Sequence, residues 1–462
     1  RFAPRGDVAV SSAFLRVINR RQVMALAFGA MVGWSWVALT GVWIGNAGAG
    51  GAIVAFIVGG GALIFVGLTY AELAAAMPFV GGEHVYSRRA LGATASFVCT
   101  WAILLGYVSV VAFEAVALPT VLEYLLPGFS QGYLWTIAGW DVNATWVLTG
   151  SVAAVAMIAI NMLGIRTAAK VQVLVVIVVL ASGVALVSGA AVNGNFDNVS
   201  PLFAGGLAGT LTVLVMVPFM FVGFDVIPQS AEEIDLPFAD IGRLLVLSII
   251  FAIAWYALVI TAVAFGLTHD ERSAAALPTA DASAAVLGGT WAGKFLVIGG
   301  IAGILTSWNG FLIGGSRALY ALAQAGQVPK MFAALHPRFR TPHRAILLVG
   351  GLAILSPLFG RPAMVWLVNA GGLGIVTAYA MVAWSFLVLR AREPELERPY
   401  RVRHGKVIGT LALLFSLSLA TLYLPWSPAA LVWPHEWLII IGWCLLGFAF
   451  FRHSGGGPQS SS

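Results

Sequence analysis

The sequence predicts an all-α membrane protein with twelve transmembrane helices. Of its 462 residues, 60% are hydrophobic and only 10% are charged, whereas charged residues make up about 25% of an ordinary soluble domain. The apolar residues form runs close to the roughly 20 residues that a helix needs to cross a bilayer. Short polar connections separate the runs, and no stretch has the composition of a separate soluble domain.

Twelve apolar runs of spanning length follow one another along the chain. They cover residues 23–45, 51–77, 96–118, 144–163, 171–189, 207–224, 244–267, 295–323, 345–359, 364–389, 408–424 and 433–451. The ninth run is short enough to need flanking residues or a thin bilayer to span. We therefore predict twelve spans with boundaries that shift by a few residues.

The basic residues predict the orientation of the chain. Its net charge of +6 does not indicate a nucleic-acid partner, because the Lys and Arg residues lie between apolar runs rather than on one polar face. If the N-terminus is cytoplasmic, only Arg272, Lys294 and Arg361 of the 25 Lys and Arg residues fall outside. Such a bias marks cytoplasmic loops. We expect a multi-pass protein of the cell (inner) membrane with both termini in the cytoplasm.

Two runs carry residues that weaken a helix near its middle. The first contains Gly29 and Gly33, and the sixth contains Pro218 and Gly223. Matched interruptions at the first position of two five-helix sets indicate an inverted repeat with a binding site at the midplane. Glycine also allows close helix packing in membranes, but the matched pair favours two broken helices, 1 and 6.

Several short motifs resemble those of a known family. They are Tyr-Ala-Glu-Leu at 70–73, Met-Pro at 77–78 followed by Gly-Gly at 81–82, Gly-Phe-Asp at 223–225, Ala-Glu-Glu at 231–233, Gly-Ser-Arg-Ala-Leu-Tyr-Ala at 315–321 and Arg-Pro-Tyr at 398–400. In order and spacing they resemble the amino acid/polyamine/organocation (APC) superfamily of secondary transporters, which has the LeuT-type fold. The resemblance covers nearly the whole chain.

The resemblance and the apolar runs together imply six regions. They are a cytoplasmic N-terminal segment at 1–22, a first five-helix repeat at 23–190, a second at 207–389, a cytoplasmic loop at 390–407, two peripheral helices at 408–451 and a disordered cytoplasmic tail at 452–462. The chain departs from the family at the first break, where Trp34 and Trp36 stand near the expected binding region, and at His84, where a Tyr is common. These departures concern specificity rather than fold.

The resemblance also implies a substrate site at the two breaks. Backbone N–H groups of the first break would receive a carboxylate, backbone carbonyls of both breaks would accept from an ammonium group, and aromatic rings would wall the pocket. The residues assigned to the substrate in this way are Met31, Gly33, Trp34, Ser35, Tyr107, Phe219, Phe221, Val222 and Phe224. For the aromatic residues, packing or lipid contact is the alternative.

Three acidic residues lie inside apolar runs, where each costs about 2.5 to 3.5 kcal/mol on insertion scales. For Glu72 we expect a structural pairing with a cytoplasmic-side Arg or a backbone group. Asp225 follows the sixth-helix break and is a candidate for binding a cation, carrying a proton or capping the second half-helix. Glu114 is a candidate for attracting a cationic amine, carrying a proton or forming a salt bridge.

The spacing of polar residues in the eighth apolar run bears on which ion is coupled to transport. Sodium-coupled relatives of this fold hold the ion between helix 1 carbonyls and a helix 8 carbonyl followed by two hydroxyls. The matching candidates are Gly29, Val32, Gly303, Thr306 and Ser307. Proton-coupled relatives place a Lys in helix 5 where this chain has Val179. Ser and Thr in membrane helices also bond their own backbone, so sodium is one expectation and proton coupling or exchange are the others.

The functional prediction is a secondary active transporter of an amino acid that works by alternating access, with no cofactor other than a candidate sodium ion. An organic amine or polyamine is the alternative substrate, because Trp34 and Trp36 offer ring faces that attract an ammonium group. A membrane enzyme is disfavoured, since no Cys/His cluster has metal-ligand spacing. A channel would need rings of charge or carbonyls along a continuous pore, whereas the sequence predicts two broken helices. The partners expected are a small molecule and the lipid bilayer.

Overall fold

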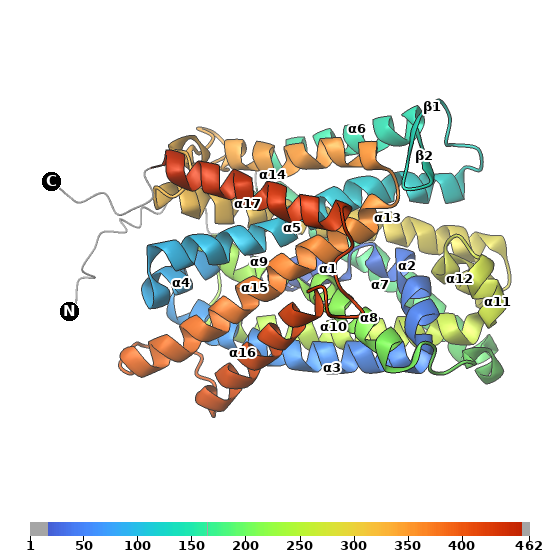
Figure 1. Cartoon of the computed structure of the whole chain (residues 1–462), viewed down its shortest axis with the longest axis horizontal. Helices are drawn as coiled ribbons and strands as arrows, with labels where there is room; N and C mark the ends of the chain where they lie inside the picture. The colour runs from blue at the N-terminus through green and yellow to red at the C-terminus, as the bar shows by residue number, and fades with distance from the viewer. Residues whose placement is uncertain (1–16, 164, 455–462) are drawn as a thin grey trace.

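The computed structural model describes residues 17–163 and 165–454 of the chain. Its described part is 77% helix, which confirms an all-α membrane protein. Most of the N-terminal segment predicted at 1–22 and of the tail predicted at 452–462 lies outside the described residues. The helices run roughly along one long axis and form a bundle (Figure 1).

Ten helical segments of the described part are long and apolar enough to cross a membrane. They are α3 (Thr40–Ala76), α5 (Ala93–Leu125), α6 (Ala144–Met162), α7 (Ile165–Asn193), the pair α8 (Gly206–Phe221) and α9 (Val226–Gln229), α10 (Phe238–Gly266), α13 (Thr290–Gln324), α15 (Ala363–Arg392), α16 (Gly405–Leu422) and α17 (His435–His453). Each coincides with one of the predicted apolar runs, usually with a few more residues at either end.

The first and ninth predicted runs lack a helix of that length. The first is divided among α1 (Arg20–Val32), α2 (Ser35–Ala38) and the start of α3, and α3 itself turns at Gly48, where φ is +69°. A side chain at Gly48 would lie 2.5 Å from the Leu202 carbonyl oxygen. The ninth run forms α14 (His343–Leu355) and a 3-10 turn, η4 (Ser356–Phe359). Among the described residues the count by length is therefore ten, and the total of twelve spans stays a prediction.

Short elements cover the two ends of the bundle (Figure 1). One end carries α4 (Glu83–Leu91). The other carries a hairpin of β1 (Tyr133–Ile137) and β2 (Trp140–Asn143) together with α11 (His269–Ala274) and α12 (Pro278–Leu287). Three further 3-10 turns are η1 (Phe196–Val199), η2 (Ala231–Glu233) and η3 (Lys330–Ala333). These elements were not predicted, because their segments are too short to show a clear hydrophobic period.

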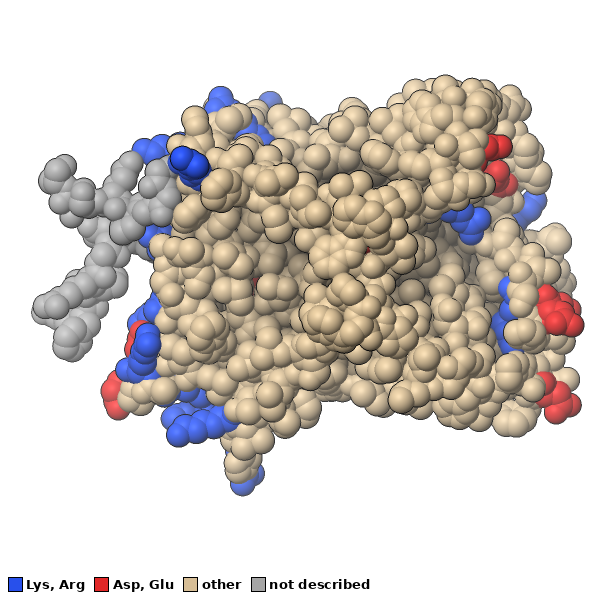
Figure 2. Space-filling model, in the orientation of Figure 1, with Lys and Arg blue, Asp and Glu red and all other residues tan. Residues whose placement is uncertain are grey.

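Charged side chains are concentrated at the two ends of the molecular surface (Figure 2). On the face shown in Figure 2, Lys and Arg gather at the end that carries α4, Asp and Glu are more frequent at the opposite end, and the band between them is uncharged. The spanning helices expose large apolar side chains such as Ile57, Leu174 and Leu445. Exposed apolar surface on this scale is what a bilayer covers.

Two buried acids, each paired with arginine, link separate elements of the bundle. Glu72 of α3 accepts from the Nε atoms of Arg390 and Arg398, each at 2.9 Å, and from the Val402 N–H at 2.8 Å. The structural pairing predicted for Glu72 is thereby confirmed. Glu233 of η2 accepts from Arg317 Nε of α13 at 2.8 Å, with both side chains at most 2% exposed.

Candidate functional site

The two predicted interruptions lie at the ends of α1 and α8 and meet in the centre of the bundle. Helix α1 ends at Val32 and α2 starts at Ser35, while α8 ends at Phe221 and α9 starts at Val226. Gly223 has φ +134°, and a Cβ there would lie 2.8 Å from the Met31 backbone nitrogen. The second break therefore rests directly on the end of α1, and only glycine fits this contact.

Tyr256 of α10 ties both breaks together. Its hydroxyl donates to the Met31 carbonyl at 2.6 Å and lies 3.1 Å from the Met220 carbonyl. With its proton directed at Met31, the same oxygen accepts from the Ser35 hydroxyl at 3.1 Å. The hydroxyl thus satisfies the Met31 carbonyl of α1 and the Ser35 hydroxyl of α2, which the first break leaves without helical partners, and it lies next to the end of α8. Sequence reasoning missed Tyr256, because nothing local in α10 indicates a contact with residues more than 200 positions away.

Removing the Tyr256 hydroxyl is expected to loosen both breaks. In Tyr256→Phe the buried Met31 carbonyl loses its donor, which costs about 1 to 3 kcal/mol and corresponds to roughly a fivefold to hundredfold weaker apparent substrate affinity. Concentration-dependent uptake in liposomes measures the change. Tyr133→Phe, on an exposed strand residue, is the control. Equal uptake curves for both variants and the wild type would show that Tyr256 does not position the breaks.

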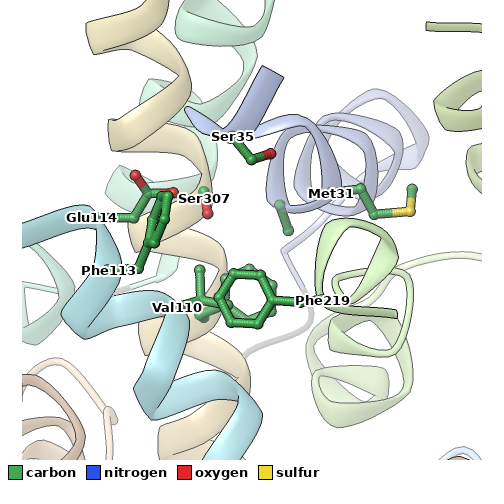
Figure 3. Close-up of a pocket in the computed structure, with 10 residues that line it drawn as sticks. Met31, Ser35, Val110, Phe113, Glu114, Phe219 and Ser307 are labelled. Carbon is green, nitrogen blue, oxygen red and sulfur yellow. The ribbon is translucent and has the colours of Figure 1, made fainter. Parts of the chain in front are cut away.

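A small cavity lies between the breaks, α5 and α13. Its lining is largely apolar, with three polar side chains, and consists of Ala30, Met31, Gly33, Ser35, Val110, Phe113, Glu114, Phe219, Ser307 and Phe311. Figure 3 shows Phe219 and Val110 on one side and Glu114 and Ser307 on another. Of the residues assigned to the substrate from the sequence, Met31, Gly33, Ser35 and Phe219 line this cavity.

The structure places the other assigned residues around the cavity rather than in its lining. The Phe221 ring packs on Phe56 and Tyr256, at centroid distances of 6.1 and 5.5 Å. Phe221 follows Phe219 by two positions, a rotation of about 200° on a helix, so the two rings face opposite sides. Val222 is buried at the break.

Two further rings form a layer next to the cavity. Tyr107 of α5 packs on the lining residue Phe311 at 5.4 Å, and Phe224 packs on Tyr70 and Tyr379 at 5.4 and 5.5 Å. Phe224 lies in the break, where the chain has left the helical path that would aim it with Phe219. The contacts of Phe224 are with other aromatic rings, as the packing alternative expects, whereas the Tyr107 hydroxyl also interacts with the Asp225 carboxylate.

The two tryptophans of the first break face away from the cavity. The six-membered ring of Trp34 lies on Gly300 of α13, whose missing side chain makes room for it. Trp36 meets Trp255 of α10 edge to face at 5.2 Å. Both indoles are fully buried, so neither ring face is turned to the cavity as a cation–π site would require.

Glu114 is the one charged residue that lines the cavity. Its side chain comes from α5 and lies beside Ser307 of α13 (Figure 3). The carboxylate interacts with the Ser307 hydroxyl and with the Trp34 backbone N–H. One oxygen, Oε1, lies 2.8 Å from the point where a Cβ on Gly33 would stand. An acidic side chain from α5 therefore reaches the break between α1 and α2.

Asp225 has a local role at the second break. Its Oδ1 accepts from the Gly223 N–H at 2.7 Å, and the carboxylate also interacts with the Tyr107 hydroxyl of α5. It makes no side-chain cap on α9. The carboxylate therefore fixes the turn that precedes α9 instead of capping the second half-helix.

Glu83 of α4 is a buried acid that sequence reasoning missed. It accepts from Gln229 of α9, and its Oε1 is without a partner in the described chain. Burial and the nearby charge of Asp225 raise the pKa of Glu83 well above its usual range. Its neighbour His84 is buried against Ser96, and burial lowers the pKa of this imidazole to about 3, which keeps it neutral. The sequence does show an acidic residue directly after Gly81 and Gly82. Because acidic residues in loops are usually exposed to water, this pattern did not indicate a buried carboxylate.

Three of the five groups expected to bind sodium meet at one place. The Thr306 hydroxyl lies 2.9 Å from the Gly29 carbonyl and 2.8 Å from the Gly303 carbonyl. Ser307 instead faces Gly33 and Glu114. Val32 is buried at the end of α1.

A side-chain amide stands next to these sodium candidates. Gln172 Nε2 donates to the Ala25 and Thr306 carbonyls at 3.2 and 3.0 Å, and it would lie 2.6 Å from a Cβ on Gly29. An N–H donor repels a cation and competes for carbonyl oxygens. The residues present therefore fit a sodium ion only in part, and its binding stays a prediction.

Comparison with known proteins identifies the relatives of this chain. Residues 18–450 match the family model described as amino acid permease. The branched-chain amino acid permease BcaP of Bacillus subtilis (strain 168) is 28% identical over 87% of each chain. The methylthioribose transporter of the same organism is 25% identical over 87% of each chain. Cationic amino acid transporter 4 of Mus musculus is 28% identical over 84% of this chain and 62% of its own length.

Proposed function

The chain belongs to the amino acid permease family, and from that premise we propose that it is a secondary active transporter that moves an amino acid by alternating access. The observation that carries the proposal is the cavity enclosed by the two helix breaks. Interrupted helices supply backbone donors and acceptors that would otherwise be unsatisfied in a membrane. An amino acid uses both kinds, through its carboxylate and its ammonium group.

The proposal extends to the architecture. We take α1 and α2 with the start of α3 as span 1, the rest of α3 as span 2, α8 with α9 as span 6, and α14 as span 9, which gives twelve spans. The breaks then fall at the first position of two five-helix repeats, 23–190 and 207–389, as in the LeuT-type fold. The last two helices, α16 and α17, expose most of their surface, which supports their placement at the periphery.

The orientation follows from charge. The end with α4 carries most of the Lys and Arg seen in Figure 2, and basic residues concentrate on the cytoplasmic side of membrane proteins. We therefore assign this end to the cytoplasm, and with it both termini.

The cavity lining suggests the class of amino acid. Six of its ten residues are apolar, and Glu114 is the one ionisable residue, so no second acid is present for a long cationic side chain. A small apolar amino acid fits best. The named cargoes of the relatives differ from one another, so the cargo must be measured. An organic amine is the second candidate because of the Glu114 carboxylate.

Uptake by the purified protein in liposomes tests the proposal. Labelled amino acids, with L-alanine, L-valine and L-leucine first, and organic amines are offered under separate sodium and proton gradients. Uptake of an apolar amino acid supports the proposal, whereas the absence of uptake and exchange for every compound contradicts it. Uptake that is unchanged without sodium and in Thr306→Ala would remove the sodium site.

A further inference from the structure

Glu114 is a buried carboxylate without a basic partner in the described part of the chain. It is 2% exposed and takes part in none of the ion pairs found there. The groups that face it are the Trp34 N–H and Gly33 from the first break, Ser307 from α13 and, as the one titratable side chain, Tyr256 from α10. A lone buried carboxylate is costly, so it needs a proton or a cation from outside the protein.

The position of this carboxylate coincides with the expected place of the substrate carboxylate. Its Oε1 lies against Gly33. The carboxylate interacts with the Trp34 N–H, which is a donor that an amino acid carboxylate would use at the break. The other oxygen, Oε2, is buried without a hydrogen-bond partner among the residues that the structure describes. Two carboxylates at one set of donors cannot both be ionised at close range, because each disfavours the charge of the other.

We propose that Glu114 binds the proton that accompanies each amino acid through the transporter. This inference rests on the proposed function and names its coupling group. A proton from the water on the side of entry forms an O–H bond with the Glu114 carboxylate, and the substrate carboxylate then takes the backbone donors of the first break. On the other side the O–H bond breaks, the proton passes to water, and Glu114 returns to the Trp34 N–H. One positive charge crosses with each zwitterion.

The cavity itself supports a proton rather than a cationic substrate. Apart from Glu114 its polar side chains are two serines, so nothing else there balances a charge. A neutral zwitterion and a neutral Glu114 leave the buried site without net charge, which is the least costly state in a membrane interior.

The test uses the full-length protein in liposomes that contain a trapped pH-sensitive dye. L-alanine, L-valine and L-leucine are added outside, with isobutylamine as the counterpart of valine that lacks the carboxylate. The wild type is expected to acidify the lumen during amino acid uptake and to accumulate substrate up to about tenfold for each pH unit of gradient. In Glu114→Gln, any remaining amino acid exchange is expected to proceed without acidification and without dependence on external pH.

Matched variants separate coupling from structure. Glu123→Gln removes an exposed acid from the same helix, α5, and is expected to behave like the wild type. Glu114→Asp keeps the carboxylate and should keep proton movement, even if Glu114→Gln is poorly folded. Uptake of an amino acid by the wild type without acidification, or acidification retained in Glu114→Gln, overturns the inference, as does proton-free uptake of isobutylamine in place of valine. Absence of uptake of any compound instead overturns the proposed function.

Discussion

Gly223→Ala is expected to abolish most amino acid uptake. The residue has φ +134°, a backbone angle that residues other than glycine rarely adopt. A Cβ at this position would lie 2.8 to 3.0 Å from backbone atoms of Ala30 and Met31. The second break must then move away from the first. Strain of about 1 to 3 kcal/mol predicts a roughly fivefold to hundredfold loss of transport efficiency, measured as initial uptake per folded protein.

A second glycine serves as the control for this prediction. Gly61 lies in α3 with no atom within 4 Å of the position of a Cβ, so Gly61→Ala adds a methyl group to a helix without a contact. It should transport like the wild type. If Gly223→Ala transports equally well, the contact between the two breaks does not matter for function.

Glu72→Ala is expected to have the largest effect on stability. It removes the acceptor of Arg390, Arg398 and the Val402 N–H at once. Leaving buried charge uncompensated costs about 3 to 5 kcal/mol. Reversible unfolding in mixed detergent micelles measures the free energy of unfolding of the variant and the wild type.

An exposed ion pair provides the comparison for Glu72. Glu393 pairs with Arg89 at the surface, where the two side chains are 32% and 44% exposed. Exposed pairs contribute about 0 to 1 kcal/mol, so Glu393→Ala should change the free energy of unfolding little. Equal losses in the two variants would contradict the role assigned to burial.

The sequence predicted the helices and the breaks because their signals are local. Long apolar runs require a membrane, and the glycines at 33 and 223 and the proline at 218 mark the places where a helix weakens. Two runs do not form long helices. The run at 23–45 contains a break, and the run at 345–359 is itself short. Turns such as the one at Gly48 depend on contact with Leu202, which no local pattern contains.

The site was predictable only to the level of the breaks. Met31, Gly33, Ser35 and Phe219 line the cavity, but the direction of a side chain after a break depends on the path of the chain, as Phe224 shows. The partners that complete the site come from distant helices. Tyr256 and Gln172 form hydrogen bonds across 225 and 147 residues, and their own segments carry no sign of these contacts.

The central claim is that one amino acid binds where the two broken helices meet. An experimental structure of the protein with L-leucine or L-valine bound tests it most directly. The account predicts a molecule in the cavity between α1, α5, α8 and α13, with its carboxylate at the backbone N–H groups of Gly33, Trp34 and Ser35 and its side chain against Phe219. A bound amino acid located elsewhere, with the cavity filled only by protein side chains, would contradict the account.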